Sequence, residues 1–584
     1  MPKIPKMDEN LVEVPKGATI RKDQSVYVNQ GNYRSISKKT GKAYTNHNKV
    51  KIGVMYVGDS ENCKGKMYAN KNYRMIFDQE NLPELPERAD AQHIGVKLVI
   101  NKICQEYKLF DILGETFEND EVNLIIDLSM YMCMESSGVF QHFPIWAWEN
   151  DIYSSKIRSD SYISKFLGDI LTCSKIKKFL KKWAQNNIGN GNVYFCYDST
   201  NVNTKAEGIF IAQKGYAKDN KNIPQVNTEY IVRQEDGVPL TFSDFPGSIV
   251  DISEASEMIE FLKEIVENFL ITLVCDRGYI SAENIEKLTQ AGIDFLLMLR
   301  SNMNDVKDLL DKYAKNLKTD IDSHYKDEGF YGQTIEMPLY GEGENKCFNI
   351  IYSRNLEGEH IDKFHQELYR KEKFLQSCID KKKNITSREI KEHSKWHNLS
   401  VGKGDVIELP VNGRSHKTHL IQHYKILSYQ RNKRKIKKTY DKCGCYILLS
   451  SKIISPLEAK IAYSKRDCVE KVFQALKSSL GMDKFGIHSD ENLHGKSLIW
   501  FVASIFRAVL IKKTEKLREN NKKLYTFPAI VKELKTITAD RNLDKNKYEK
   551  RYKLDKMQKN ILECFNLDLD NINIHINSMN KKTI

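Results

Sequence analysis

The chain carries NVYFCYDST at residues 192–200 and ITLVCDRGY at residues 271–279, two apolar runs of strand length that each lead to an aspartate. A continuous apolar run of this length is typical of a strand that is buried on both faces. Between the second run and a third one, DFLLMLR at 294–300, the segment 281–292 has helical spacing. Buried strands that alternate with helices predict an α/β unit whose sheet is covered on both sides.

The two aspartates, Asp198 and Asp276, are the first candidate site residues. If the two strands are neighbours in one sheet, both carboxylates emerge at the same edge, where open α/β folds place their sites. An aspartate after a strand also commonly caps the next turn or helix. A capping role and a catalytic role therefore both stay open at this point.

A third acidic residue lies on a helix that we expect to run from Pro456. In this helix Tyr463, Arg466, Glu470 and Lys477 stand at offsets 0, 3, 7 and 14. At 3.6 residues per turn, all four fall near one stripe. Such a helix can deliver a carboxylate to the aspartate pair, with cations on either side of it for a phosphate backbone. The simpler alternative is an exposed Arg–Glu pair on a solvated helix.

The spacing Y-(2)-R-(3)-E-(6)-K in YSKRDCVEKVFQALK, residues 463–477, resembles the signature of one group of bacterial DDE insertion-sequence transposases. The surroundings also resemble that group, with YDST at the first acid, CDRGY at the second and CYILLS before the signature helix. The resemblance covers roughly residues 192–300 and 444–513.

This resemblance implies an RNase H-like catalytic core in which Asp198, Asp276 and Glu470 bind two Mg²⁺ ions, for which Mn²⁺ can substitute. Carboxylates suit this role because Mg²⁺ prefers hard oxygen ligands. The implied reaction is cleavage of the terminal inverted repeats of the protein's own insertion element, followed by joining of the 3′ ends to target DNA. One metal ion activates the attacking oxygen and the other stabilises the leaving oxygen.

The resemblance also implies DNA contacts. Tyr463, Arg466 and Lys477 are expected at the phosphates near the cleaved end. Trp396 is the only tryptophan of the insertion, and in similar enzymes an aromatic residue of this region stacks on a flipped base. An aromatic residue that anchors a loop to the core is the alternative for Trp396.

Two basic segments are further candidates for DNA contact. The run 431–438 holds six cations, among them Arg431, Lys433, Arg434 and Lys435. It suits a DNA backbone or, equally, a charged strand edge in solvent. The helix expected over 161–186 ends with a lysine-rich face that includes Lys178 and Lys182. This face suits DNA phosphates or plain solvation.

The full prediction is an α/β RNase H-like core interrupted by a β-rich insertion domain, with an N-terminal β segment, a helical DNA-binding region and a helical C-terminal tail. The expected parts are a small β-rich region at 1–85, a helical DNA-end-binding domain at 86–190, core at 191–300, insertion at 301–444, core with the signature helix at 445–513 and a helical region at 514–584.

Composition agrees with a nucleic-acid partner without requiring one. Ninety-one Lys and Arg residues oppose 77 Asp and Glu, and the net charge of +14 points to a polyanion, either nucleic acid or an acidic membrane surface. The longest apolar run, 497–511, is too short for a bilayer and contains Arg507. Twelve cysteines without a CxxC pair indicate reduced thiols. We therefore expect a cytoplasmic protein that associates with the nucleoid when active.

The expected partner is double-stranded DNA, as terminal repeats and as target, bound by a homodimer because two ends must be brought together. Two other functions compete with transposition. A non-catalytic DNA-binding protein would have no reason to keep three acids that face phosphates. An RNase H-like nuclease without strand transfer has the same residue chemistry and stays open.

Overall fold

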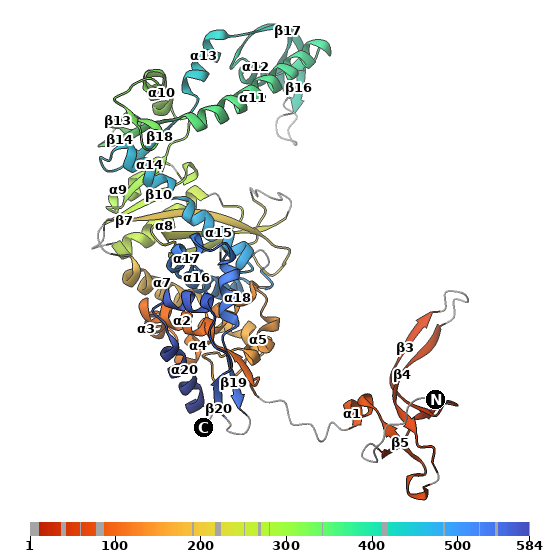
Figure 1. Cartoon of the computed structure of the whole chain (residues 1–584). Helices are drawn as coiled ribbons and strands as arrows, with labels where there is room; N and C mark the ends of the chain where they lie inside the picture. Colours follow the sequence, from red (N-terminus) through yellow and green to blue (C-terminus); the bar gives the residue numbers. More distant parts are fainter. Residues whose placement is uncertain are drawn as a thin grey trace. The chain divides into compact units, whose positions relative to one another are not determined.

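The computed structural model describes residues 11–36, 43–58, 60–77, 87–189, 192–215, 223–249, 251–266, 270–279, 281–341, 343–410, 418–482, 485–524, 526–542 and 547–582. The chain forms two compact units, Met1–Glu87 and Arg88–Ile584 (Figure 1).

The first unit is a small antiparallel sheet with strand order β1-β5-β4-β3-β2. Its elements are β1 (Leu11–Glu13), β2 (Thr19–Ile20), β3 (Ser25–Ile36), β4 (Ala43–Met55), β5 (Lys66–Ala69) and α1 (Lys71–Phe77). Val26 and Val28 of β3 point to the same side and are buried with Ile52 and Met67. The alternation of apolar residues along the strands therefore builds this core.

The second unit is built on a nine-stranded mixed sheet with the order β12-β13-β14-β18-β11-β10-β7-β8-β9. The strands are β7 (Asn192–Asn203), β8 (Gln225–Arg233), β9 (Pro239–Pro246), β10 (Leu270–Cys275), β11 (Asp294–Met298), β12 (His324–Tyr325), β13 (Phe330–Pro338), β14 (Asn345–Ser353) and β18 (Cys445–Ser450). Strand β10 pairs in parallel with both β7 and β11, and the other pairs are antiparallel. The three parallel strands are the apolar runs that the sequence predicted.

Helices cover both faces of this sheet. One face packs against α8 (Asp251–Val266), α9 (Ala282–Gln290) and α10 (Asn304–Leu317), and it buries Phe195, Leu273 and Leu297. The other face buries Cys196 and Val274 in the same core as α14 (Pro456–Ser464), α15 (Asp467–Ser479) and α16 (Asp490–Lys513). Successive residues of one strand thus enter opposite cores, which explains why the strands are apolar throughout.

The helices before and after the sheet share one core. They are α2 (Gly95–Glu106), α3 (Leu109–Gly114), α4 (Asn119–Glu135), α5 (Phe143–Glu149), α6 (Asp160–Lys165), α7 (Cys173–Asn187), α17 (Glu515–Glu519), α18 (Phe527–Lys535), α19 (Lys556–Glu563) and α20 (Leu569–Lys582). A three-stranded sheet, β20 (Lys547–Lys550), β19 (Thr538–Asn542) and β6 (Ala91–His93), joins the two ends of this unit. Regions 86–190 and 514–584, which we predicted as separate parts, therefore fold together around one core.

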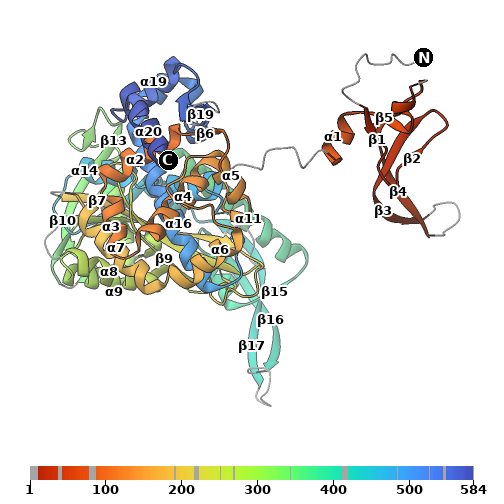
Figure 2. The same ribbon diagram turned by 90° about the horizontal axis from the view of Figure 1, so that it is seen from below.

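Helix α16 is the central element of that core and packs against α2, α4 and α7 (Figure 2). Among the described residues it is the one helix long and apolar enough to cross a membrane, but 83% of its most apolar window is buried inside the protein. Packing in the core accounts for its composition.

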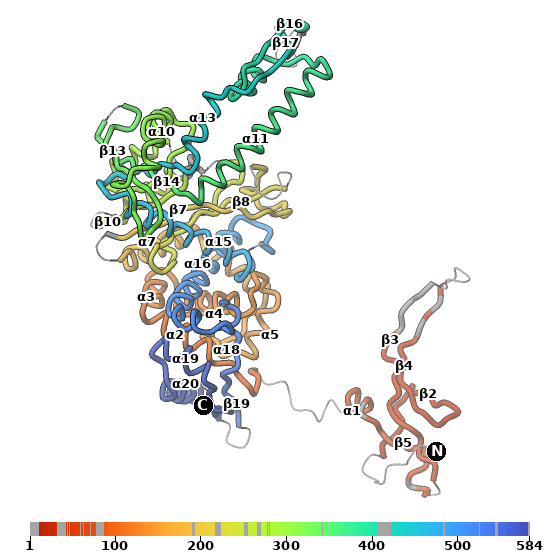
Figure 3. Tube along the Cα trace, turned by 45° about the horizontal axis from the view of Figure 1, so that its top comes forward, coloured from red at the N-terminus to blue at the C-terminus, as the bar shows by residue number. Residues whose placement is uncertain are grey.

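The predicted insertion at 301–444 differs from the structure at its beginning. Strands β12, β13 and β14 belong to the nine-stranded sheet, so the segment outside the sheet runs from 354 to 442. It contains α11 (Arg354–Asp380), β15 (Asn384–Ile385), α12 (Ser387–His393), β16 (His397–Pro410), β17 (Thr418–Arg431) and α13 (Lys433–Lys442). Its small sheet has the order β15-β17-β16, and α11 packs along β17 (Figure 3).

The two ends of this insertion meet. Strand β14, which precedes it, pairs with β18, which follows it, and Tyr352 stands opposite Cys445. The backbone N–H of Ser353 donates to the carbonyl oxygen of Gly444 at 3.0 Å. The chain therefore leaves and rejoins the sheet at one point.

Candidate active site

Asp198 and Asp276 are neighbours on adjacent parallel strands. Strand β10 pairs with β7 so that Cys275 stands opposite Tyr197, and the next residue on each strand is an aspartate. Asp276 directly follows the last residue of β10, as expected. Asp198 instead lies inside β7, because residues 199–203 continue to pair with β8. The two carboxylates nevertheless share one edge of the parallel part of the sheet.

The helix that carries the other candidate residues is broken in two, where we expected it to be continuous. Helix α14 ends at Ser464 and α15 begins at Asp467. Arg466 lies in the break, where its N–H donates to the carbonyl of Tyr463 at 3.0 Å and its own carbonyl accepts from Val469 at 3.2 Å. These bonds over three residues make the tighter turn of a 3₁₀ helix.

The break brings Arg466 to the carboxylates. Its Nη1 donates to Oδ2 of Asp198 at 3.2 Å, and its Nη2 donates to Oε1 of Glu470 at 2.5 Å. The Tyr463 hydroxyl, at the end of α14, donates to Oδ1 of Asp276 at 3.2 Å. All three predicted acids are thus in direct contact with two residues of the signature segment.

Tyr279 is a site residue that the sequence reasoning missed. Its hydroxyl donates to Oδ1 of Asp198 at 3.2 Å, and the backbone N–H of Ser199 donates to the same oxygen at 2.9 Å. The ring is 5% exposed and lies 4.6 Å from the ring of Tyr197. The available signal was its place in CDRGY, where a short 3₁₀ turn after Asp276 directs it back toward the sheet.

The electrostatics of the site keep the donors protonated. Burial acts to lower the pKa of Arg466, but the negative charges of Asp198, Asp276 and Glu470 raise it above its ordinary value. Burial, and then the charge of Asp276, raise the pKa of the Tyr463 hydroxyl well above the usual range. Arg466 is therefore a permanent cation here, and Tyr463 is a neutral donor at physiological pH.

The chemistry of the three acids suits a divalent metal ion, although in this structure Asp198 and Glu470 both pair with the guanidinium of Arg466. In the described part of the chain, no group of three or more His, Cys, Asp or Glu side chains has the geometry to hold a metal ion. The place between Asp198 and Glu470 is nevertheless one that attracts a cation, since Arg466 occupies it. The atoms of these three acids that could bind a metal ion are all carboxylate oxygens, the ligands that Mg²⁺ and Mn²⁺ prefer. Asp198, Asp276 and Glu470 are the residues that would hold such ions.

The remaining residues of the signature and the insertion have different surroundings. Lys477 lies in the last turn of α15, partly exposed and two turns beyond Glu470. Trp396 is 3% exposed, and its indole N–H donates to Thr439 Oγ1 at 2.9 Å. Its ring packs edge-on against Phe364, 4.9 Å between centroids. The structure thus places Trp396 as an anchor between α11 and α13, and its stacking on a base stays a prediction.

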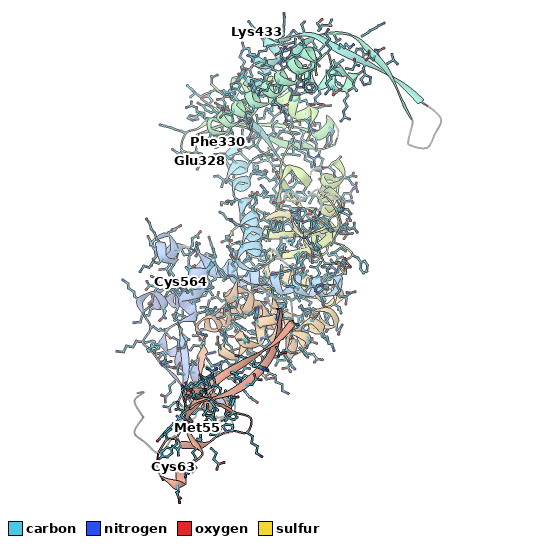
Figure 4. All side chains as sticks on the ribbon, turned by 90° about the vertical axis from the view of Figure 1, so that its right-hand side faces the viewer. Met55, Cys63, Glu328, Phe330, Lys433 and Cys564 are labelled. Atoms are coloured by element: carbon cyan, nitrogen blue, oxygen red, sulfur yellow. The ribbon has the colours of Figure 1, made fainter. Side chains whose placement is uncertain are left out.

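The cations of 431–438 lie at the end of β17 and on α13, a helix and not the strand edge that we considered. Arg431 makes a two-pronged ion pair with Glu372, at 2.7 and 2.9 Å. Lys435 donates to the carbonyl of Ser394 at 3.1 Å. Lys433 and Arg434 are exposed at the start of α13, where Figure 4 labels Lys433. The exposed face of α13 stays a candidate for DNA contact.

The lysines of α7 contact acidic helices of the same unit. Lys178 donates to the carbonyl of Glu115 at 2.9 Å, and Lys182 pairs with the Glu115 carboxylate at 3.0 Å. Lys181 pairs with Glu264 at 3.2 Å. These contacts occupy part of the lysine face, and a role in DNA binding stays a prediction.

Comparison with known proteins adds independent information. The family described as the transposase DDE domain matches residues 190–506, more than half of the chain. No relative was found among curated proteins. Among solved structures, the cryo-EM structure of a piggyBac transposase synaptic complex with hairpin DNA is similar, with a TM-score of 0.34 and 10% identity over 76% of this chain and 78% of that one.

Proposed function

The chain belongs to the DDE transposase family, and we propose that it cleaves the terminal inverted repeats of its own insertion element and joins the 3′ ends to target DNA. The observation that carries this proposal is the meeting of Asp198, Asp276 and Glu470 with Tyr463 and Arg466. These residues come from two strands and a broken helix that are far apart along the chain.

The reaction needs cations because a DNA phosphodiester is anionic and its leaving oxygen is poor. Two Mg²⁺ ions, when bound, would supply activation of the attacking oxygen and stabilisation of the departing one. The backbone pairing of β7 with β10 holds Asp198 and Asp276 side by side. Tyr279 and the Ser199 N–H fix one oxygen of Asp198, which leaves Oδ2 directed to the place that Arg466 now holds.

Arg466, Tyr463 and Lys477 are proposed to contact the phosphates at the cleaved end. Arg466 and Tyr463 already point into the site, and their donors suit phosphate oxygens as well as carboxylates. They position the DNA and do not take protons from it. When DNA and cations bind, Arg466 can exchange a carboxylate partner for a phosphate without losing a counter-charge.

The proposed partner is double-stranded DNA, held by two copies of the chain so that two ends react together. The positive net charge of +14 supports a polyanionic partner. We also propose that the protein acts in the cytoplasm at the nucleoid, where such DNA lies.

Cleavage of a duplex that carries the DNA flanking the reading frame tests this function. Purified protein with Mg²⁺ or Mn²⁺ is expected to nick that duplex, and Asp198→Asn, Asp276→Asn and Glu470→Gln are each expected to abolish nicking while DNA binding persists. Asp467→Asn is the matched control, since Asp467 also lies in the first turn of α15 but pairs with Lys471 at 2.8 Å.

Strand transfer is read separately, by adding a supercoiled target plasmid and detecting joined product. Nicking without joined product would favour a nuclease, and specific binding without nicking would favour a non-catalytic DNA-binding protein. Normal nicking by any of the three variants would contradict the role of that acid.

A further inference from the structure

A cleft separate from the active site lies beside α15, away from the carboxylates of Asp198, Asp276 and Glu470. It has a volume of about 810 Å³ and is lined by the turn between β8 and β9, by α15, by the end of α16 and by the start of α18. The residues of α15 that line it include Lys471 and Ser478, whereas Glu470 and Lys477 do not. Helix α15 therefore separates this cleft from the active site.

Arg507 is the unusual group of the cleft. It lies in α16, most of whose residues are buried, and its Nε atom is buried without a hydrogen-bond partner. Within the residues that the structure describes, Arg507 forms no ion pair with a carboxylate, and its guanidinium lies 5.7 Å from the centre of the Phe527 ring. Burial, and then the charge of Arg518, lower the pKa of Arg507 to about 10.

Arg518 of α17 is a second guanidinium in the same cleft. Its Nη2 donates to the carbonyl of Ile511 at 3.3 Å. The two arginines repel each other, and this repulsion acts against the charge of Arg507. Two like charges at one cleft are unfavourable unless an anion lies between them or water screens them.

Three acids line the cleft, Glu235, Asp236 and Glu515, and two of them are paired with cations. Asp236 forms a close ion pair with Arg233, and Glu515 pairs with Lys512 at 3.0 Å. Lys471, the remaining lysine, pairs with Asp467 outside the cleft. The four cations that line the cleft, Lys471, Arg507, Lys512 and Arg518, outnumber its three acids.

We propose that this cleft binds a phosphate-type oxyanion between Arg507 and Arg518. A buried cation without a counter-charge is costly, and a bound oxyanion removes that cost. Guanidinium groups match the planar oxygen pairs of phosphate, and the hydroxyls of Ser479 and Thr526 add donors around the cleft. The oxyanion comes either from a DNA backbone or from a free phosphate compound.

Thermal unfolding of the full chain tests the proposal, with inorganic phosphate replacing chloride at constant ionic strength. Phosphate is expected to raise the Tm of the wild-type protein in a saturable way, because a ligand that binds only the folded state stabilises it. Arg507→Gln and Arg518→Gln are each expected to remove this rise. Lys165→Gln removes an exposed cation on α6 and is expected to keep it.

The Tm of Arg507→Gln in chloride, without phosphate, is a second test of the proposal. Without phosphate its Tm is expected to equal or exceed that of the wild type, because the variant removes a buried charge that has no counter-charge. A purely structural arginine would give a lower Tm. A phosphate-dependent rise that persists in both arginine variants would overturn the proposal, and so would a lowered Tm of Arg507→Gln in chloride.

Fluorescence anisotropy with a duplex that lacks the terminal repeats measures DNA affinity, and it distinguishes a DNA backbone from a free phosphate compound as the source of the oxyanion. Weaker duplex binding by Arg507→Gln, together with loss of the phosphate effect, assigns the cleft to a DNA backbone. Unchanged duplex binding with loss of the phosphate effect assigns it to a free phosphate compound. Neither measurement involves cleavage, so the inference and the proposed transposase activity fail or succeed independently.

Discussion

Replacement of Arg466 by Gln is expected to tighten the binding of divalent metal ions. In the structure Arg466 holds Asp198 and Glu470, two of the three acids that would ligate the metal. A metal ion must therefore displace the guanidinium before it can bind. Arg466→Gln removes this competitor and leaves the carboxylates in place.

The magnitude follows from the two bonds that the metal has to break. The pair with Asp198 joins side chains that are 16% and 20% exposed, and a charge-assisted hydrogen bond of this kind contributes about 1.5–3 kcal/mol. Glu470 is 55% exposed, so its pair with Arg466 contributes about 0.5 kcal/mol. A total of about 2–3.5 kcal/mol corresponds to metal binding that is roughly 30- to 300-fold tighter.

Isothermal titration calorimetry of the DNA-free protein with Mn²⁺ measures this change directly. Lys471→Gln is the control, because it removes one positive charge from α15 without touching the three acids. Metal binding by Arg466→Gln that is equal to or weaker than that of the wild type would refute the competition between arginine and metal. Cleavage by Arg466→Gln is still expected to fall, since the same side chain is proposed to hold the phosphate.

Three further predictions concern other residues. Tyr279→Phe removes the donor to Asp198 and is expected to slow nicking about 3- to 10-fold in single-turnover assays, corresponding to roughly 1 kcal/mol; an unchanged rate would show that Asp198 does not need this contact. Trp396→Ala is expected to lower the free energy of unfolding of the insertion by about 3–5 kcal/mol in denaturant titrations, and loss of DNA affinity with unchanged stability would support base stacking instead. The Asp244 carboxylate, 3.8 Å from the His494 ring, and then the Cys173 side chain raise the pKa of His494 to about 10. Because the folded-state pKa is raised, the stabilisation by His494 is complete below about pH 6.5 and is lost toward pH 10. The difference in Tm between the wild type and His494→Gln is therefore expected to shrink from pH 6.5 to pH 9.5, and a constant difference would contradict this assignment.

The carboxylates of the site could be predicted from sequence because each follows from a local pattern. Asp276 follows an apolar run, as Asp198 does. The two acids were predicted to lie close together on the assumption that both runs are strands of one sheet, and the strands do pair in parallel. Glu470 was found through the spacing of its neighbours. The break between Ser464 and Asp467 could not be predicted, because no Gly or Pro marks it. At the break Arg466 contacts Asp198, which lies 268 positions earlier in the chain.

Contacts between distant segments explain the other differences. Tyr279 reaches Asp198 across 81 positions of the sequence, and its place in CDRGY suggests a site residue without identifying its partner. The sequence placed β13 and β14 in the insertion because β18, which joins β14 to the core sheet, lies almost a hundred residues later in the chain. Trp396 is buried by Phe364 and Thr439, which come from two different helices. Local periodicity carries no information about such pairings.

Because β14 and β18 meet at Ser353 and Gly444, the insertion can be shortened or replaced without a change in the sheet. Since its entry and exit are already joined by a backbone hydrogen bond, a change in its length alters only the entropy of closing a loop, which grows slowly with length. A two-residue hairpin grafted between these positions would leave the strand register of the sheet intact. The segment can therefore diverge, grow or be exchanged while the scaffold beneath the three acids stays the same.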